Sequence, residues 1–138
     1  MQSDRVVLDT NCLLASISRR GEAYPVWREF QEDRYILCVS NEILAEYEEV
    51  IAHNTTPEIA RNVLDYIMKR RNVELIDPHF HFSLITTDPD DNKFVDCAFA
   101  ANATYIVSDD SHYDVLRNIS FPEILVLKLQ TFIEKLKQ

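Results

Sequence analysis

Short apolar runs alternate along the chain with longer stretches in which apolar residues recur at helical spacing. The short runs are rich in β-branched and aromatic residues and predict strands at Arg5–Leu8, Tyr35–Val39, Val73–Ile76, Tyr105–Val107 and Ile124–Leu127. The longer stretches predict helices at about 12–17, 24–33, 41–51, 57–71 and 92–102 and at the C-terminus. Strands that alternate with helices favour right-handed crossovers between parallel strands. The pattern therefore predicts one α/β domain over residues 1–138, with a central parallel sheet of about five strands and helices on both faces.

Acidic residues occur where this sheet would bring them together. Asp9 directly follows the first predicted strand, and Asp110 follows a later one. Sites in parallel α/β sheets form beyond the carboxyl ends of the strands. Glu46 lies beside the apolar face of the helix that Ser40 starts as N-cap, and Asp91 lies at the start of another helix. We therefore expect these four acids to share one cleft.

A cluster of carboxylates predicts a bound divalent cation. Like charges a few ångströms apart raise each other's pKa, so the acids stay ionised together only when cations balance them. Mg²⁺ and Mn²⁺ prefer oxygen ligands, and such ions orient a phosphate and activate water for attack on it. The acidic pattern therefore predicts a Mg²⁺ or Mn²⁺ site that cuts phosphodiester bonds.

Two of the four acids also have simpler explanations. Asp9 and Asp91 each precede a helix and could act as N-caps. Asp96 follows Asp91 by five residues and points away from it on a helix, yet it interrupts an apolar stretch. Local sequence alone leaves these alternatives open.

The other two acids have competitors nearby. Glu46 could be a solvated helix residue, and the same helix carries Glu42, Glu48 and Glu49. Asp109 stands next to Asp110, and either one could be the fourth acid or a turn residue. Glu46 is the best placed glutamate because it adjoins the apolar face.

The composition suits a globular protein and excludes several classes. The chain has 138 residues, 46% hydrophobic and 27% charged, and its apolar runs are far shorter than the ~20 residues of a membrane-spanning helix. A single glycine, Gly21, excludes P-loops and dinucleotide-binding loops, which need several. Cys12, Cys38 and Cys97 are odd in number and lie among apolar residues, which indicates buried reduced thiols. With no leader at Met1–Asp4, we expect a soluble cytoplasmic protein that does not bind membranes.

The formal net charge of −9 argues against a general electrostatic grip on nucleic acid, which normally needs basic patches facing the phosphates. The one run of three basic residues, Lys69–Arg71, is best explained as the solvated end of a helix. The conflict with a phosphodiester substrate is smaller if several carboxylates bind metal. It is also smaller if basic residues gather near the cleft or come from a partner chain.

Four stretches of the chain resemble the motifs of the PIN domain family. Val7–Asn11 is similar to the first motif, an Asp-Thr-Asn-like sequence after the first strand. Ser40–Glu46 is similar to the second, a serine that opens a helix with an acid about two turns in. Asp88–Ala98 resembles the helix motif of the toxin branch, and Ile106–His112 resembles the fourth motif, which favours Asp110 as the fourth acid. The four motifs occur in order and span nearly the whole chain.

The resemblance implies a metal-dependent endoribonuclease that hydrolyses RNA, in many bacterial members the toxin of a toxin–antitoxin pair. The implied catalytic acids are Asp9, Glu46, Asp91 and Asp110, which would hold one or two Mg²⁺ or Mn²⁺ ions with support from Asp96. The metals would orient the phosphate, activate a water and stabilise charge on the departing oxygen.

Further residues and partners are implied around this centre. Hydrogen bonds to the carboxylates or the phosphate are expected from Thr10, Asn11 and Ser108. Lys93, Arg19 and Arg20 are candidates for phosphate contacts, although an ordinary solvated surface explains each of them at least as well. Family members commonly pair with a small antitoxin and associate as homodimers. The candidate apolar surface for such contacts is Trp27, Phe30 and Tyr35, which core packing explains equally well.

Other interpretations use the same residues differently. A catalytically inactive module that binds RNA or a partner protein would use the acids as caps and solvated surface. A receiver domain or phosphatase also has an aspartate after a parallel strand, but a two-aspartate phosphatase needs an acid where this chain has Asn11. His79, His81 and His112 could join a site, although loop histidines are more often solvated.

Overall fold

The sheet of the computed structural model has five strands. The structure describes residues 3–138. Met1 and Gln2, which belong to the stretch where the sequence predicts no leader, lie outside the described residues. The strands are β1 (Arg5–Leu8), β2 (Ile36–Val39), β3 (Val73–Leu75), β4 (Tyr105–Val107) and β5 (Val126–Leu127). Their order in the sheet is β3-β2-β1-β4-β5, and each neighbouring pair is parallel. The predicted parallel sheet of about five strands is confirmed.

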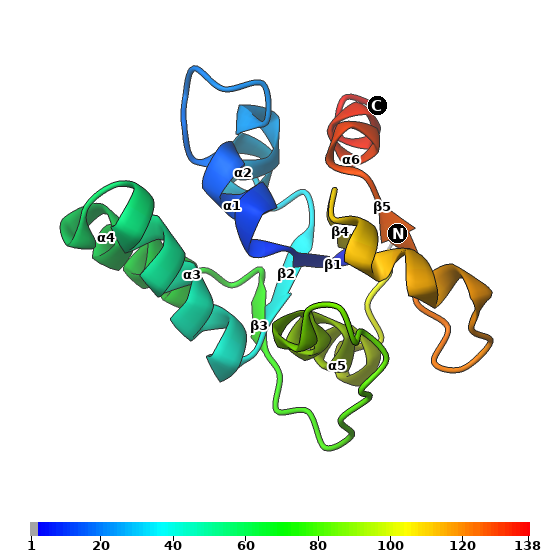
Figure 1. Cartoon of the computed structure of the whole chain (residues 1–138). Helices are drawn as coiled ribbons and strands as arrows, with labels where there is room; N and C mark the ends of the chain where they lie inside the picture. The colour runs from blue at the N-terminus through cyan, green and yellow to red at the C-terminus, as the bar shows by residue number, and fades with distance from the viewer. Residues whose placement is uncertain (1–2) are drawn as a thin grey trace.

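Helices cover both faces of this sheet. They are α1 (Thr10–Ser16), α2 (Tyr24–Gln31), α3 (Asn41–Asn54), α4 (Pro57–Lys69), α5 (Asn92–Ala101) and α6 (Leu129–Leu136), with the 3-10 helices η1 (Pro89–Asp91) and η2 (Ser111–Asn118). Figure 1 shows α5 on one side of the strands and α1, α2 and α6 on the other, with the α3–α4 pair beside β2 and β3. The predicted α/β arrangement is therefore confirmed. Within residues 3–138, no helix is both long and apolar enough to cross a membrane.

The central strand β1 is buried on both faces. Val6, Val7 and Leu8 are at most 1% exposed, because a parallel strand between two layers of helices has no solvent side. Val6 is in register with Leu37 of β2 and Tyr105 of β4. Burial of each such side chain contributes about 1.5–3 kcal/mol, so the site beyond the end of β1 adjoins a strand that is packed on both faces.

Hydroxyl groups start the two helices that follow β2. Ser40 Oγ accepts a hydrogen bond from Ile43 N (3.3 Å), and Thr56 Oγ1 accepts one from Ile59 N (3.1 Å). Each cap satisfies an amide that the first helical turn leaves free and stabilises the helix by about 1 kcal/mol. The predicted N-cap at Ser40 is confirmed, and it fixes where Glu46 falls on α3.

Some predicted element ends were wrong by a few residues. The helix predicted to reach Asn102 ends at Ala101, because Asn102 takes the left-handed conformation with φ 50°. The helix predicted to reach Asp33 ends at Gln31, and Asp33 likewise has φ 61°. The last strand shortens to Val126–Leu127. The 3-10 helix η2 was not predicted, because its three-residue period matches neither the helical nor the strand pattern.

The core contains residues that were candidates for a dimer surface. Phe30 and Tyr35 are each 1% exposed, and the ring of the half-buried Trp27 lies 5.3 Å from that of Phe30. Core packing therefore explains these residues, and the predicted homodimer gains no support from them. The three cysteines are free and buried, as predicted.

Candidate metal centre

Asp9 lies at the junction of β1 and α1, at the carboxyl edge of the sheet. It is 6% exposed, and its carboxylate makes no side-chain capping hydrogen bond to α1. Ser108 Oγ donates a hydrogen bond to Asp9 Oδ2 (2.6 Å) and accepts one from the amide of Asp110 (3.0 Å). One hydroxyl group after β4 therefore positions the acid after β1 and the start of η2 together.

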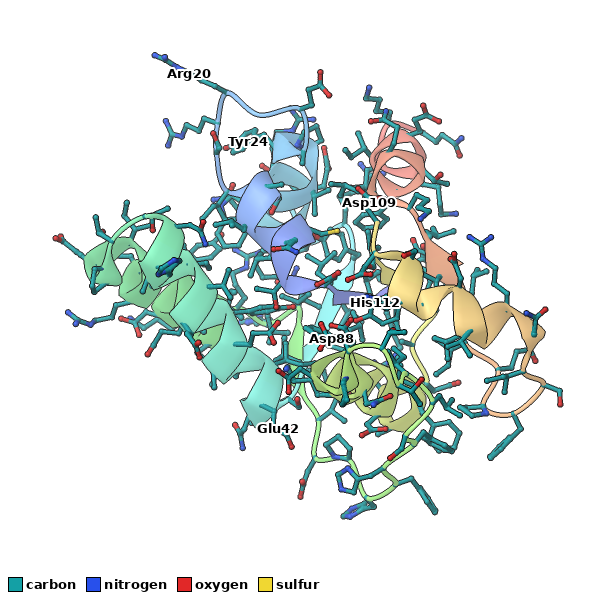
Figure 2. The ribbon with its side chains drawn as sticks, viewed as in Figure 1. Arg20, Tyr24, Glu42, Asp88, Asp109 and His112 are labelled. Carbon is teal, nitrogen blue, oxygen red and sulfur yellow. The ribbon has the colours of Figure 1, made fainter. Side chains whose placement is uncertain are left out.

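Glu46 reaches the same edge from α3. Thr10 Oγ1, at the start of α1, donates to Glu46 Oε2, and Lys93 Nζ of α5 lies 2.6 Å from Glu46 Oε1. The next residue, Tyr47, holds α3 against β1 through a hydrogen bond from its hydroxyl to the last carbonyl of that strand (2.7 Å). By contrast, the competing Glu42 is exposed in the first turn of α3, at the end of the helix nearest α5 (Figure 2). The contacts thus connect Glu46 to α1 and α5.

Lys93 is already paired in this structure. Besides the ion pair with Glu46, its ammonium donates to Asp90 O (2.9 Å) and lies 5.5 Å from the ring centre of Phe94. Its predicted phosphate contact stays a prediction. Arg20, predicted for the same role, stands at the tip of the loop between α1 and α2 and points away from the other elements (Figure 2).

His112 joins acids in and before η1 to the acid that precedes η2. Its Nδ1 lies 3.1 Å from Asp91 Oδ2, 3.1 Å from Asp110 Oδ1 and 4.0 Å from Asp88 Oδ2. Figure 2 shows His112 and Asp88 close together between η2 and α5. Asp91 is 9% exposed and makes no side-chain cap of α5, so a capping role does not account for it. The sequence left His112 among three loop histidines, and only its position two residues after Asp110 distinguished it.

The two adjacent aspartates after β4 have different surroundings. Asp110 precedes η2 and accepts a hydrogen bond from the amide of His112 (2.9 Å). Asp109 turns toward α6, where its Oδ1 accepts a hydrogen bond from Leu129 N (2.9 Å), as its place in Figure 2 shows. Both still line a cavity of about 340 Å³, whose other lining residues are Asp9, Asn11, Cys12, Ala15 and Leu129. Asp110 is thus the one that contacts His112.

Burial and like charges raise the pKa of two of the acids. Burial is the main reason that the pKa of Asp9 is raised, and the charges of Asp110 and Glu46 raise it further. Burial also raises the pKa of Asp91 from 3.8 to about 6, aided by neighbouring carboxylates and opposed by the hydrogen bond from His112. That hydrogen bond is the main reason that the pKa of His112 is raised. The predicted acids therefore lie within electrostatic reach of one another.

Tyr113 is a site residue that the sequence did not reveal. It is 1% exposed, and its hydroxyl has no hydrogen-bond partner among residues 3–138. Burial raises its pKa, and so do the charges of Asp9, Asp91, Asp110 and Glu46, so the hydroxyl lies near all four acids. A buried hydroxyl without a partner costs about 1–3 kcal/mol. No sequence pattern marked Tyr113 as a site residue, because an aromatic residue in this position is ordinarily part of a core.

Asp96 lies apart from these contacts. Its Oδ1 accepts a hydrogen bond from Phe82 N (2.7 Å), and its Oδ2 lies 3.2 Å from His81 Nδ1. It therefore ties the segment between β3 and η1 to α5. None of its hydrogen bonds within residues 3–138 joins it to the other acids, so its predicted part in metal binding gains no support from these contacts.

The family model for the PIN domain matches residues 5–112. This chain belongs to the PIN domain family. The matched region contains the first strand of this PIN domain, its acids and His112, and ends just inside η2. The resemblance noted from the four motifs is therefore confirmed at the level of the family.

Two solved structures share this PIN domain's fold. VapBC2 from Rickettsia felis, bound to a DNA fragment from their promoter, is 18% identical, with 90% of this chain and 98% of that chain covered and a TM-score of 0.62. The T. brucei RRP44 PIN domain is 14% identical, with 97% and 81% covered and a TM-score of 0.52. Identities this low establish the fold alone. No curated protein matches the sequence significantly.

The residues at this edge of the PIN domain fit a divalent cation. Carboxylate oxygens are the ligands that Mg²⁺ and Mn²⁺ prefer. Burial, with a smaller part from neighbouring carboxylates, raises the pKa of Asp9 and Asp91, and a bound cation would favour their ionised forms. A water carried by a cation would also give the Tyr113 hydroxyl the partner that it lacks within residues 3–138. Both observations favour a positive ion at the cluster.

Proposed function

We propose that this PIN domain is a Mg²⁺- or Mn²⁺-dependent endoribonuclease and the toxin of a bacterial toxin–antitoxin pair. The observation that carries the proposal is that contacts at the carboxyl edge of the sheet bring together Asp9, Glu46, Asp91 and Asp110, which come from four separate segments. Ser108 bonds both Asp9 and the amide of Asp110, and His112 Nδ1 lies 3.1 Å from an oxygen of Asp91 and of Asp110. Thr10, next to Asp9, donates to Glu46. Membership of the PIN domain family supports a nuclease. The fold of VapBC2 supports the toxin assignment.

The four acids have distinct places around the proposed cation. Asp9, Asp91 and Asp110 would hold it, and Glu46 would complete the set from α3. A bound Mg²⁺ or Mn²⁺ lowers the pKa of a coordinated water and balances charge on the leaving oxygen. The acids come from β1, α3, η1 and the start of η2, so the folded sheet sets their spacing before any ion binds.

Uncharged and cationic neighbours orient these acids. Ser108 fixes the Asp9 carboxylate by donating to Oδ2, while Thr10 and Lys93 each hold one oxygen of Glu46. Such supporting contacts typically change metal affinity or activity by about 10–100-fold when removed. In this proposal the main role of Lys93 is to orient Glu46. A phosphate of the substrate would have to compete with Glu46 for the Lys93 ammonium.

The net charge of −9 bears on the partners of this chain. An acidic protein gains little from general attraction to RNA, so we propose that the cations carry much of the phosphate contact. The same charge suits a basic segment of a small antitoxin, which we propose as the protein partner. It also suits the protein-binding form of the alternative function, a catalytically inactive module that binds RNA or a protein.

Cleavage of mixed single-stranded and structured RNA separates these two functions. The purified protein is expected to cut RNA with Mg²⁺ or Mn²⁺ and to stop with EDTA. Asp91→Asn should lower the rate by more than about 100-fold, beyond the usual effect of an outer contact. The matched control is Asp90→Asn, which removes one exposed carboxylate next to the site and should leave the rate within about threefold. Folded protein that binds Mn²⁺ but cuts no RNA would favour the binding module.

A further inference from the structure

One cluster near the four acids contains a nitrogen donor. His112 Nδ1 and one carboxylate oxygen each from Asp88 and Asp91 all lie within 4.8 Å of one another. We propose that His112 is a ligand of the cation together with Asp88 and Asp91, and that its nitrogen makes the centre bind Mn²⁺ more tightly than Mg²⁺. The inference rests on the cation centre of the proposed function and adds two ligands, His112 and Asp88, and a metal preference to it.

The three donor atoms have a spacing that one cation requires. His112 Nδ1 lies 3.1 Å from Asp91 Oδ2 and 4.0 Å from Asp88 Oδ2. Ligands at roughly 2.1 Å from one octahedral ion lie about 3 Å apart when adjacent and about 4 Å apart when opposite. Small side-chain adjustments therefore suffice to place the three atoms around an ion. The side chains of Asp88 and His112 are 43% and 33% exposed, so an ion with its waters can enter from solvent.

The nitrogen donor changes which cation is preferred. Mg²⁺ takes oxygen ligands almost exclusively and gives up its waters reluctantly, whereas Mn²⁺ accepts imidazole along with carboxylates. In this cluster the imidazole nitrogen is flanked by carboxylates, including Asp110 Oδ1 at 3.1 Å. A Mn²⁺ ion bound there would require neutral His112, with Nδ1 as the donor atom and these carboxylates as the balancing charge.

Tyr113 provides an independent observation at the same place. It follows His112 directly on η2 and is buried, and its hydroxyl has no hydrogen-bond partner among residues 3–138. The charges of Asp9, Asp91 and Asp110 raise the pKa of this hydroxyl, so it lies within their electrostatic range. Buried hydroxyl groups are normally bonded to protein or to ordered water. A water on the cation would satisfy this hydroxyl, whereas the described side chains do not. The unpartnered group therefore points to an ion with its water beside His112.

Pulsed electron paramagnetic resonance of Mn²⁺ tests the proposal, because it detects a nitrogen bonded to the ion without any RNA cleavage. The metal-free full chain receives one equivalent of Mn²⁺, and calorimetric titrations give the affinities for Mn²⁺ and Mg²⁺. The variant is His112→Asn. The matched control is His81→Asn, since His81 also lies beside a buried aspartate, Asp96, but away from the cluster. Circular dichroism checks that each variant is folded.

We expect nitrogen coupling to Mn²⁺ in the wild type and in His81→Asn, and none in His112→Asn. His112→Asn should weaken Mn²⁺ binding by at least about tenfold and Mg²⁺ binding by less than about threefold. Asp88→Asn, which keeps a good N-cap residue, should retain the nitrogen signal and weaken both cations. These results together would establish His112 as a ligand.

The contrary outcomes are distinguishable. If Mn²⁺ binds without nitrogen coupling, or the coupling persists in His112→Asn, the proposed ligand is wrong while the carboxylate centre stands. Equal loss of Mg²⁺ and Mn²⁺ affinity in His112→Asn would overturn the metal preference. If the folded protein binds neither cation, both this inference and the cation dependence of the proposed function fail.

Discussion

Single side chains decide how much negative charge the cluster holds. Asp9 and Glu46 each receive hydrogen bonds or an ion pair, and Asp91 contacts His112. Even so, the pKa of Asp9 and that of Asp91 are raised, so these partners do not fully offset burial and repulsion. In the absence of cations the site therefore costs stability. Two substitutions measure this cost.

Asp91→Asn should stabilise the metal-free protein at neutral pH. The pKa of Asp91 is about 6 against an ordinary 3.8, so the protonated side chain favours the folded protein. This contribution to the free energy of unfolding is complete below about pH 4 and is lost as the pH rises through 6. A shift of about two units corresponds to ~3 kcal/mol, and the lost contact with His112 offsets part of it. We expect a gain of about 1–2 kcal/mol at pH 7 and almost none at pH 4. Urea unfolding with EDTA between pH 4 and 8 measures it, and a less stable Asp91→Asn at pH 7 would refute this account.

Tyr113→Phe should leave the metal-free protein equally stable or more stable, by up to about 1 kcal/mol, because the lost hydroxyl has no partner among residues 3–138. The matched control is Tyr47→Phe, which removes a buried hydroxyl that donates to Leu8 O (2.7 Å). That change should destabilise the protein by about 1 kcal/mol. Thermal unfolding with EDTA compares the two. A loss in Tyr113→Phe as large as in Tyr47→Phe would show that the Tyr113 hydroxyl is bonded.

At the scale of elements, α5 holds the long segment between β3 and η1. Asp96 accepts a hydrogen bond from the amide of Phe82. The side chain of Asn92 accepts a hydrogen bond from Ile85 N and donates one to Ile85 O (2.9 Å each). The helix itself was predictable from its apolar spacing. These contacts were not, because Phe82 and Ile85 belong to a segment without periodicity, and side-chain contacts to such a segment leave no pattern in the sequence.

Asp96→Ala should loosen this segment. Hydrogen bonds to a charged acceptor contribute about 1.5–3 kcal/mol, so the Phe82 amide should exchange its hydrogen at least about tenfold faster. Asp96→Asn, which keeps a carbonyl oxygen in place, should have a smaller effect. Hydrogen exchange with mass spectrometry measures both, and Mn²⁺ titration of the same variants tests the predicted metal role of Asp96. Unchanged exchange together with lost Mn²⁺ affinity would assign Asp96 to the cation instead.

At the scale of the whole molecule, parallel connectivity determines where the acids meet. Ser108 and Asp9 are 99 residues apart yet share a hydrogen bond, because β1 and β4 are neighbours whose carboxyl ends lie at one edge. This much followed from the order of strands, helices and motifs. The ion pair of Lys93 with Glu46, the place of His112 and the unpartnered Tyr113 did not, since they depend on side-chain directions that only packing sets.

The most direct measurement is the single-turnover rate of RNA cleavage with Mn²⁺ for the wild type and for neutral variants of the four acids. These are Asp9→Asn, Glu46→Gln, Asp91→Asn and Asp110→Asn. The adjacent Asp109→Asn serves as comparison, because Asp109 is bonded to Leu129 N and its asparagine can keep that bond. If the acids share one cation centre, the cleavage rate should fall by more than about 100-fold in each of the three aspartate variants at positions 9, 91 and 110. It should fall by less than about tenfold in Asp109→Asn. Full activity in Asp9→Asn or Asp110→Asn would contradict the centre.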